Sequence, residues 1–395
     1  MSADPIVIVA AKRTPMGNYN GVFKTIPTPQ LGTYAIAALL DSVILPEKKV
    51  DAVYMGCVLS AGLGQAPARQ AALGSNLPFS TPCTTINKMC GSGMQSILLG
   101  CRDIQSHHAD IVIAGGMENM SRAPFLLQNA RIGLRMGTHE LMDHMQLDGL
   151  INAYPPHLSM GAIAENCALD YKITRAQQDA FAIASIQRAT QATHAGFFKD
   201  EITPITVSDK KGNITTITED EGIQKANIEK IAHLKPAFLE NGSITAANAS
   251  SISDGAAALM LMRLSKANKL NIKPIAQIIG DASIAQAPEQ FPTAPIAAIK
   301  KLFEKIKWTT EDVDLFEINE AFAVVTLATM KTLGIPFEKV NVHGGACILG
   351  HPIGASGARI LVTLIHALKQ QKKKRGVAAI CIGGGEAIAI AITLI

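Results

Sequence analysis

Cys90 lies in the segment TINKMCGSGMQSILLG, residues 85–100, directly ahead of Gly-Ser-Gly and an apolar stretch with helical spacing. A helix N-terminus carries free N–H groups and a positive dipole end, so we expect the pKa of the Cys90 thiol to be lowered. Gly91 and Gly93 would let the backbone approach a substrate and direct N–H groups at an oxyanion. The segment therefore predicts a nucleophilic cysteine, and the alternative is a cysteine packed in the core beside glycine.

His351 lies in a second glycine-rich segment, GGACILGHPIGASGAR, residues 344–359. Pro352 disfavours helical backbone at the residue before it, so we expect His351 in a turn ahead of a helix that begins near Ser356. A lone histidine is more often structural than functional, but a glycine-rich turn at a helix start makes a functional role equally plausible.

Two further polar positions end predicted strands, where ligands gather in α/β proteins. Asn319 ends the strand in EINEAFAVV, residues 317–325, and Cys381 ends the buried strand in AAICIGGGEA, residues 378–387. The amide of Asn319 fits a cap as well as a substrate contact, and the glycines after Cys381 fit an ordinary tight turn. Neither position indicates a site on its own.

Four blocks of the first half recur in the second half, in the same order and at a nearly constant offset. The aligned positions are Ile6 and Ile275, Asp51 and Asp314, Gly93 and Gly357, and Gly115 and Gly383. Such repetition predicts two similar α/β halves, because each half alternates apolar strands with amphipathic helices. The helices after Cys90 and His351 then occupy equivalent positions. We expect their N-termini to meet at one pocket with Cys381, where cysteine and histidine make an activated nucleophile.

The repeat leaves a remainder that we expect to be an insertion in the first half, carrying substrate or subunit contacts. The expected domains are residues 1–120 with 252–273, the inserted loop domain 121–251, and residues 274–395. Within the insertion, a helix is predicted between Thr174 as N-cap and Gly196 as stop. The small residues of NASSISDGA, 248–256, are interpreted as a turn that opens a helix.

The composition restricts the class of protein. The 395 residues are 48% hydrophobic and 17% charged, which fits a folded, deeply buried protein and argues against disorder. The net charge of +4 predicts no nucleic-acid partner, and the basic run at 369–376 fits a solvated loop. Seven scattered cysteines without a C-x-x-C pair favour a reducing cytoplasm and no zinc site. No secretory leader and no apolar run of roughly 18 residues is visible, so we expect no membrane span.

Five motifs resemble those of the thiolases, and the resemblance runs over essentially the whole chain. They are NKMCGSGM around Cys90, GGMENMSRAP from Gly115, NEAFA from Asn319, GGACILGHPIGASGARI around His351 and CIGGGEA around Cys381. Residues 135–150 resemble the loop by which the biosynthetic acetyl-CoA acetyltransferase branch forms tetramers. The resemblance implies the duplicated α/β thiolase fold, with two similar βαβ-type domains in αβαβα layers and an inserted loop domain. It also implies a homotetramer built as a dimer of dimers.

The resemblance implies a role for each residue of the site. Cys90 would accept an acetyl group from acetyl-CoA after activation by His351, which would later help to bind the substrate oxygen. Cys381 would remove an α-proton from a second acetyl-CoA, giving acetoacetyl-CoA and CoA, and the same site would run the reverse thiolysis. Asn319 would hold a water that polarises the thioester with His351. The backbone N–H groups of Cys90 and Gly383 would form a second oxyanion hole.

Coenzyme A thioesters are the substrates that the resemblance implies, with no separate cofactor and no metal. The expected contacts along coenzyme A are Ser250, Ala246, Phe238, Leu150, Met160, Ala321 and Phe322. Two places depart from the family pattern. Where relatives commonly have an aromatic residue and an arginine near the adenine, this chain has Gly222 and Gln224, with Lys225 adjacent. The histidine usual before Met160 is Ser159 here, with His157 two residues earlier.

Three alternative functions stand beside the biosynthetic enzyme. A degradative 3-ketoacyl-CoA thiolase of fatty-acid β-oxidation would use the same residues on longer chains. A condensing enzyme for carrier-protein thioesters shares the duplicated fold, but the cysteine in CIGGG, residues 381–385, argues against it. A catalytically inactive scaffold is disfavoured because Cys90, His351, Cys381 and Asn319 are all present.

Overall fold

The computed structural model describes residues 4–46, 49–208 and 211–395. Within them, strands from both halves of the chain form one mixed sheet in the order β12-β13-β14-β11-β1-β10-β5-β3-β4, and β2 pairs with β10. The first-half strands are β1 (Ile6–Arg13), β2 (Gly17–Asn18), β3 (Ala52–Gly56), β4 (Cys83–Ile86), β5 (Ile111–Asn119) and β10 (Ser253–Arg263). The second-half strands are β11 (Ala276–Ala285), β12 (Leu315–Ile318), β13 (Arg375–Ile382) and β14 (Glu386–Leu394).

The strand order is symmetric about the central β1–β11 pair, which confirms the predicted duplication. Moving outward from that pair, β10, β5 and β3 lie on one side and β14, β13 and β12 on the other. The outer pairs β3–β5 and β12–β13 are both parallel. The register shifts at matching places, between Ile8 and Ala10 in β1 and between Ile278 and Gly280 in β11. Only two residue pairs join β1 to β11, so the sheet is narrowly connected there, and its two parts are called the first and the second sheet below.

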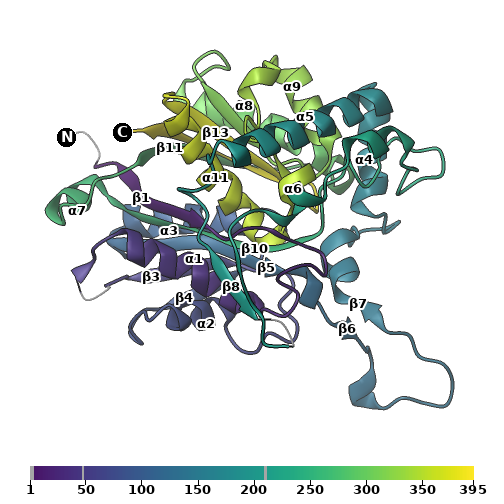
Figure 1. Ribbon diagram of the computed structural model, residues 1–395, viewed down its shortest axis with the longest axis horizontal. Helices are drawn as coiled ribbons and strands as arrows, with labels where there is room; N and C mark the ends of the chain where they lie inside the picture. The colour runs from purple at the N-terminus through teal and green to yellow at the C-terminus, as the bar shows by residue number, and fades with distance from the viewer. Residues whose placement is uncertain (1–3, 47–48, 209–210) are drawn as a thin grey trace.

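The helices form three layers around these two sheets, as Figure 1 shows. Helices α3 (Ser92–Gln105) and α11 (Ile353–Gln370) lie in the middle and pack against strands of both halves. Helices α1 (Thr28–Ser42) and α2 (Pro67–Gly74) cover the outer face of the first sheet, and α8 (Ala294–Ile306) covers that of the second. The result is the αβαβα layering that the motifs implied.

The two middle helices cross at their N-terminal ends, where glycine is required. A Cβ atom added to Gly93 would lie 2.9 Å from the backbone nitrogen of Ala358, and one on Gly357 would lie 2.6 Å from that of Met94. Such contacts are too close for any side chain, so the crossing depends on these glycines. It brings the turn before α3 and the turn before α11 together, as the duplication predicted.

The segment 121–251 packs over the second half and extends away from it. Helices α4 (Met160–Asp170) and α5 (Arg175–His194) contact α9 (Ala323–Leu333), and α5 also contacts α10 (Ala346–Leu349). Thr174 caps α5 through a capping box with Gln177, which confirms the predicted helix start. The segment also contains α6 (Glu221–Lys225) and the hairpins β6–β7 (Phe125–Leu126, Met142–Asp143) and β8–β9 (Ile205–Ser208, Ile214–Ile217). Helix α7 (Leu264–Lys269) lies outside it and follows β10. No described helix is both long and apolar enough to cross a membrane.

Two predicted boundaries were wrong. The segment after Ser253 forms strand β10, not a helix, because it pairs with β1 on one side and β5 on the other and buries both faces. This pairing overrides the helix preference of its alanine, leucine and methionine residues. Helix α11 begins at Ile353 rather than near Ser356, because Pro352, with its fixed φ of −66°, suits the N-cap position.

Candidate active site

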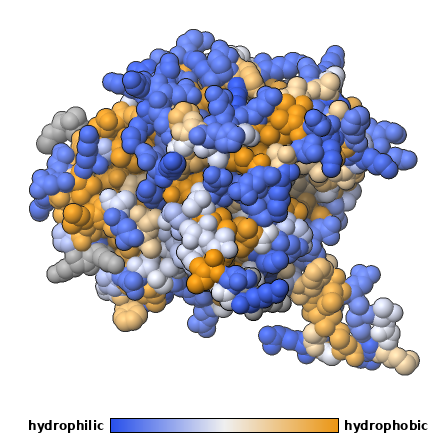
Figure 2. Space-filling model, viewed as in Figure 1, coloured by the Kyte–Doolittle hydropathy of each residue, from blue (hydrophilic) through white to orange (hydrophobic). Residues whose placement is uncertain are grey.

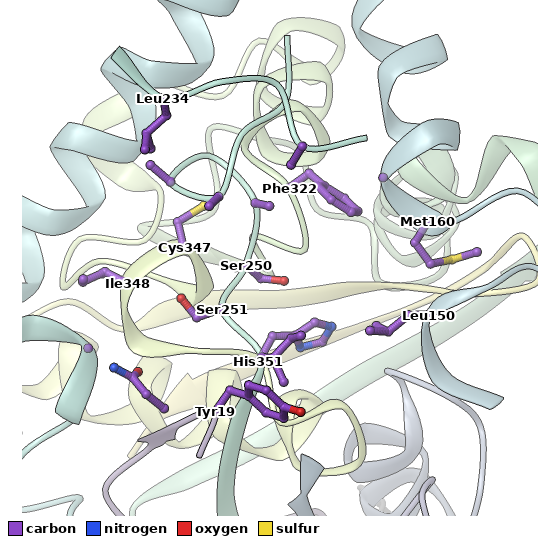
Figure 3. Close-up of a pocket in the computed structure, with 18 of the residues that line it drawn as sticks. Tyr19, Leu150, Met160, Leu234, Ser250, Ser251, Phe322, Cys347, Ile348 and His351 are labelled. Carbon is purple, nitrogen blue, oxygen red and sulfur yellow. The ribbon is translucent and has the colours of Figure 1, made fainter. Parts of the chain in front are cut away.

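A cavity of about 930 Å³ opens between segment 121–251 and the turn before α11. Figure 3 shows His351 at this cavity, with Leu150 and Met160 on one side and Ser250 and Phe322 beyond it. Six of the seven residues expected to contact coenzyme A line it, namely Leu150, Met160, Phe238, Ala246, Ser250 and Phe322. The seventh, Ala321, does not line the cavity, but its carbonyl accepts the Ser250 N–H at 3.0 Å and so fixes the wall.

Cys90 lies in a sharp turn before α3. Met89 has a left-handed φ of 44°, which is unfavourable for a residue with a side chain. Ser92 holds this turn closed, because its Oγ accepts the Lys88 N–H at 2.8 Å and donates to the Met89 carbonyl at 2.6 Å. Helix α3 then begins at Ser92, with Gly91 as N-cap, so Cys90 precedes the helix rather than opening it.

The expectation of a lowered Cys90 pKa was wrong. Burial raises the pKa of the thiol to about 11, and the backbone N–H groups of Gly383 and Cys90 offset this only in part. The nearby carboxylate of Glu118 raises the pKa further. Desolvation outweighs the helix end, whose first residue, Ser92, lies beyond Cys90. Cys90 is therefore a neutral thiol at neutral pH and needs a base when it reacts.

His351 is held at the cavity through one of its ring nitrogens. Its Nδ1 lies 2.6 Å from Ser356 Oγ and 3.5 Å from Asn319 Nδ2, so Asn319 and His351 meet as predicted. Burial, reinforced by the Arg359 charge, lowers the pKa of the imidazole to about 3, so the ring is neutral. Its Nε2 has no partner among the described residues. With Nδ1 held by Ser356, Nε2 is the nitrogen available to take a proton.

Cys381 lies at the end of β13 and packs near Cys90. Its side chain is buried, and burial, with the neighbouring Cys90, raises the pKa of the thiol well above its usual value. A Cβ added to Gly383 would lie 3.6 Å from the sulfur of Met160 and 3.9 Å from Met89, which places Gly383 beside the cavity wall. The structure thus brings Cys381 and Gly383 together with Cys90.

Apolar packing joins this cysteine pair to His351. Cys90 packs with Leu150 and Ile353, which line the cavity together with His351. Cys381 belongs to a cluster with Met160 and Phe322, which also line it. Of the predicted catalytic residues, His351 lines the cavity, and Cys90 and Cys381 lie behind its lining residues. No group of three or more described His, Cys, Asp or Glu side chains could hold a metal ion.

Glu118 is a site residue that sequence reasoning missed. It is fully buried in β5, and its carboxylate accepts the N–H groups of Val58, Leu59 and Gly354 at 2.9, 3.1 and 2.9 Å. Burial raises its pKa to about 7, and these N–H groups act in the opposite direction. Glu118 thereby ties two segments, the one after β3 and the start of α11, to β5 near Cys90. An acidic residue inside the apolar run of β5 was the available signal.

Comparison with protein families identifies both halves. Residues 6–265 match the thiolase N-terminal domain, and residues 272–394 match the thiolase C-terminal domain. The chain belongs to the thiolase family. This thiolase is 47% identical over 388 residues to acetyl-CoA acetyltransferase of Chromobacterium violaceum, a match covering 98% of this chain and 99% of the relative. It is 49% identical over 392 residues to acetyl-CoA acetyltransferase 2 of Arabidopsis thaliana, covering 99% and 97%.

Solved thiolase structures share the whole fold. The crystal structure of the Bacillus anthracis acetyl-CoA acetyltransferase superposes with a TM-score of 0.96 at 38% identity, covering 99% of each chain. A thiolase from Ascaris suum in complex with coenzyme A gives a TM-score of 0.93 at 41% identity, covering 99% of this chain and 100% of the other. At these identities the likeness extends to the family as well as the fold.

Proposed function

We propose that this thiolase is an acetyl-CoA C-acetyltransferase. It condenses two acetyl-CoA molecules to acetoacetyl-CoA and CoA, and runs the reverse thiolysis, through an acetyl group on Cys90. The observation that carries the proposal is the Cys90 sulfur, held by the backbone N–H of Gly383, close to Cys381 and packed behind Leu150 and Ile353 of the cavity lining. Relatives named acetyl-CoA acetyltransferase support the same activity.

The first half-reaction transfers acetyl to Cys90. His351 Nε2 takes the thiol proton as the sulfur attacks the thioester carbonyl, because it is a ring nitrogen without another partner and the oxyanion that forms favours the imidazolium. A water held by Asn319 and the protonated imidazole would stabilise the oxyanion. The carbon–sulfur bond to CoA breaks, and the CoA thiolate takes a proton from Cys381. Acetyl-Cys90, an imidazolium at His351 and a thiolate at Cys381 remain.

The second half-reaction makes the carbon–carbon bond. The Cys381 thiolate removes an α-proton from a second acetyl-CoA, and the carbanion attacks the acetyl carbonyl on Cys90. The backbone N–H groups of Cys90 and Gly383, which both reach the Cys90 sulfur, would receive the oxyanion that forms there. The Cys90 thiolate then leaves and recovers its proton from the His351 imidazolium. All three side chains return to their starting states.

Coenzyme A would extend from the cysteines toward the opening of the cavity. The aromatic ring of Phe238 meets that of Phe322 edge-on, with centroids 5.8 Å apart, and both line the path. Lys225 and Lys230 are the lysines of the described cavity lining, and both are exposed. Their positive charges suit the phosphate groups of coenzyme A, in place of the arginine that relatives commonly have nearby. Segment 121–251 acts in this proposal as the inserted loop domain.

A cytoplasmic homotetramer, assembled as a dimer of dimers, completes the proposal. The hairpin β6–β7 projects from the body of the molecule, and Figure 2 shows apolar side chains on it. The large exposed apolar residues there are Phe125, Leu127, Ile132, Leu134, Met136 and Leu141. Apolar surface of this kind marks a contact between proteins. Strand β4 ends the sheet and offers an open edge for a second copy.

The deciding experiment uses acetyl-CoA alone. Purified protein is incubated with it, and peptide mass spectrometry locates any acetyl group. An acetyl group on Cys90 that added CoA releases is the expected result, and folded protein without modification would favour the inactive scaffold. Thiolysis of acetoacetyl-CoA is then compared with that of a long-chain 3-ketoacyl-CoA. A clear preference for the long substrate would assign the degradative role instead.

A further inference from the structure

An ion pair links the two catalytic turns at the edge of the site. Lys88 Nζ bonds Glu386 Oε2, although the two residues are 298 positions apart in the chain. Lys88 belongs to the turn that presents Cys90, in the first half. Glu386 opens β14 directly after the glycine turn that follows Cys381, in the second half. The pair therefore bridges the halves where their reactive cysteines meet.

Both residues of this ion pair are anchored by contacts of their backbone. The Lys88 N–H is held by Ser92 Oγ at 2.8 Å, and Lys88 forms an isolated β-bridge with Cys90. Glu386 pairs with Ile382 in β13 and with Ala285 in β11. The side chains are 25% and 35% exposed, so solvent screens the pair only in part. Fixed ends reduce the ordering cost that usually cancels an exposed ion pair.

Besides the Gly383 N–H that reaches the Cys90 sulfur, the remaining contacts between the two turns are apolar. A Cβ added to Gly91 would lie 2.4 Å from Ile382 Cδ1, so these turns pack face to face. Met89 and Gly383 also approach each other. Apolar contacts of this type are non-directional. They limit how closely the two turns approach but do not prevent one turn from sliding along the other. The charge-assisted bond between two anchored residues adds a second polar link across the turns and limits that movement.

We propose that Lys88 and Glu386 are positioning residues that set the separation of Cys90 from Cys381. The proposal rests on the function above, because the Cys90–Cys381 separation is decisive when a carbanion formed beside Cys381 must reach an acetyl group on Cys90. Acetylation depends on this distance less, since the bond to Cys90 forms with His351 as base. The ion pair therefore acts on condensation more than on acetylation.

The test compares charge removal with charge exchange. Lys88→Met and Glu386→Gln each remove one charge, and the double variant Lys88→Glu with Glu386→Lys restores the pair with reversed polarity. We expect each single variant to lower the condensation rate about five- to tenfold while acetylation of Cys90 changes less than about twofold. The exchanged pair is expected to recover to within about threefold of the original rate. Lys266→Met, which breaks the partly exposed Lys266–Asp110 pair, is the matched control.

Two results would overturn the positioning role. One is an exchanged pair that is no better than the single variants, and the other is single variants that condense at the original rate. The rate at which iodoacetamide alkylates Cys90 gives a readout without acetyl-CoA. This rate should differ from that of the original protein in the single variants and should match it in the exchanged pair. If the original protein forms no acetyl-Cys90, the proposed function fails, and this alkylation series still decides the role of the ion pair.

Discussion

The turns before α3 and α11 occupy equivalent positions in the two halves, yet they carry different chemistry. In the first half the turn presents Cys90, and Ser92 closes it over a left-handed Met89. In the second half the turn presents His351, whose Nδ1 is held by Ser356. Duplication supplied two helix ends that cross at one place, and divergence gave one turn a cysteine and the other a histidine. Neither half holds a complete site.

Burial shifts the pKa values of Cys90 and His351 in opposite directions, and both shifts favour the neutral form of the group. It raises the pKa of the Cys90 thiol to about 11 and lowers that of the His351 imidazole to about 3, because a buried site disfavours the charged form of each group. Both groups are therefore neutral before substrate binds. The site differs from one that stores a thiolate–imidazolium pair, and the proton moves only as the thioester is attacked.

The largest effect is expected from Cys90→Ser, which removes the nucleophile from the first turn. Turnover should fall at least about a thousandfold, because a hydroxyl held in this neutral environment is a far weaker nucleophile than the thiol. Steady-state condensation and acetyl labelling measure it, and unchanged melting temperature and oligomeric state serve as controls. Residual activity of more than a few per cent would remove Cys90 from this role.

Cys381→Ser should separate the two half-reactions. We expect condensation to fall about a thousandfold, while acetylation of position 90 persists within about tenfold, because a CoA thiolate leaves readily without an acid. Burst labelling with acetyl-CoA measures the first step, and acetoacetyl-CoA formation measures the second. Equal losses in both steps would show that Cys381 acts on the nucleophile and not on the α-proton.

The features that could be predicted from the sequence are those marked by internal repeats and by local residue patterns. The repeat predicted two similar α/β halves and the meeting of the Cys90 and His351 turns, and the spacing of Thr174 and Gly196 predicted α5. These features follow from patterns within short stretches or from comparing the chain with itself. They need no knowledge of which distant residues become neighbours.

What sequence reasoning missed depends on tertiary surroundings. Strand β10 looked helical because its two strand neighbours, β1 and β5, are far from it in the chain. The pKa of Cys90 was predicted in the wrong direction because desolvation depends on everything packed around the thiol. The Lys88–Glu386 pair joins residues that no local pattern connects. The site residues were visible as motifs, whereas their protonation and mutual support were not.

Ser356→Ala tests whether the Ser356 hydroxyl orients the His351 imidazole. Without the hydroxyl, Nδ1 loses its 2.6 Å partner, and the imidazole is free to rotate or change tautomer. We expect acetylation of Cys90 to slow about ten- to a hundredfold, with the melting temperature little changed. Ser356→Thr keeps a hydroxyl and should restore most of the rate. An alanine variant that acetylates at the original rate would show that packing alone orients His351.

The pH dependence of Cys90 alkylation tests directly whether Cys90 and His351 are neutral before substrate binds, and its expected effect is the smallest. Iodoacetamide reacts with thiolate, and the raised pKa of about 11 keeps the thiolate fraction small at neutral pH. The rate should therefore rise about tenfold per pH unit from pH 7 to pH 10, with peptide mass spectrometry assigning the label. His351→Ala should leave this slope unchanged, because an imidazole with a pKa of about 3 carries no charge in that range. A rate that levels off below pH 8 and depends on His351 would instead establish a stored thiolate–imidazolium pair, and the two turns would then be coupled before substrate arrives.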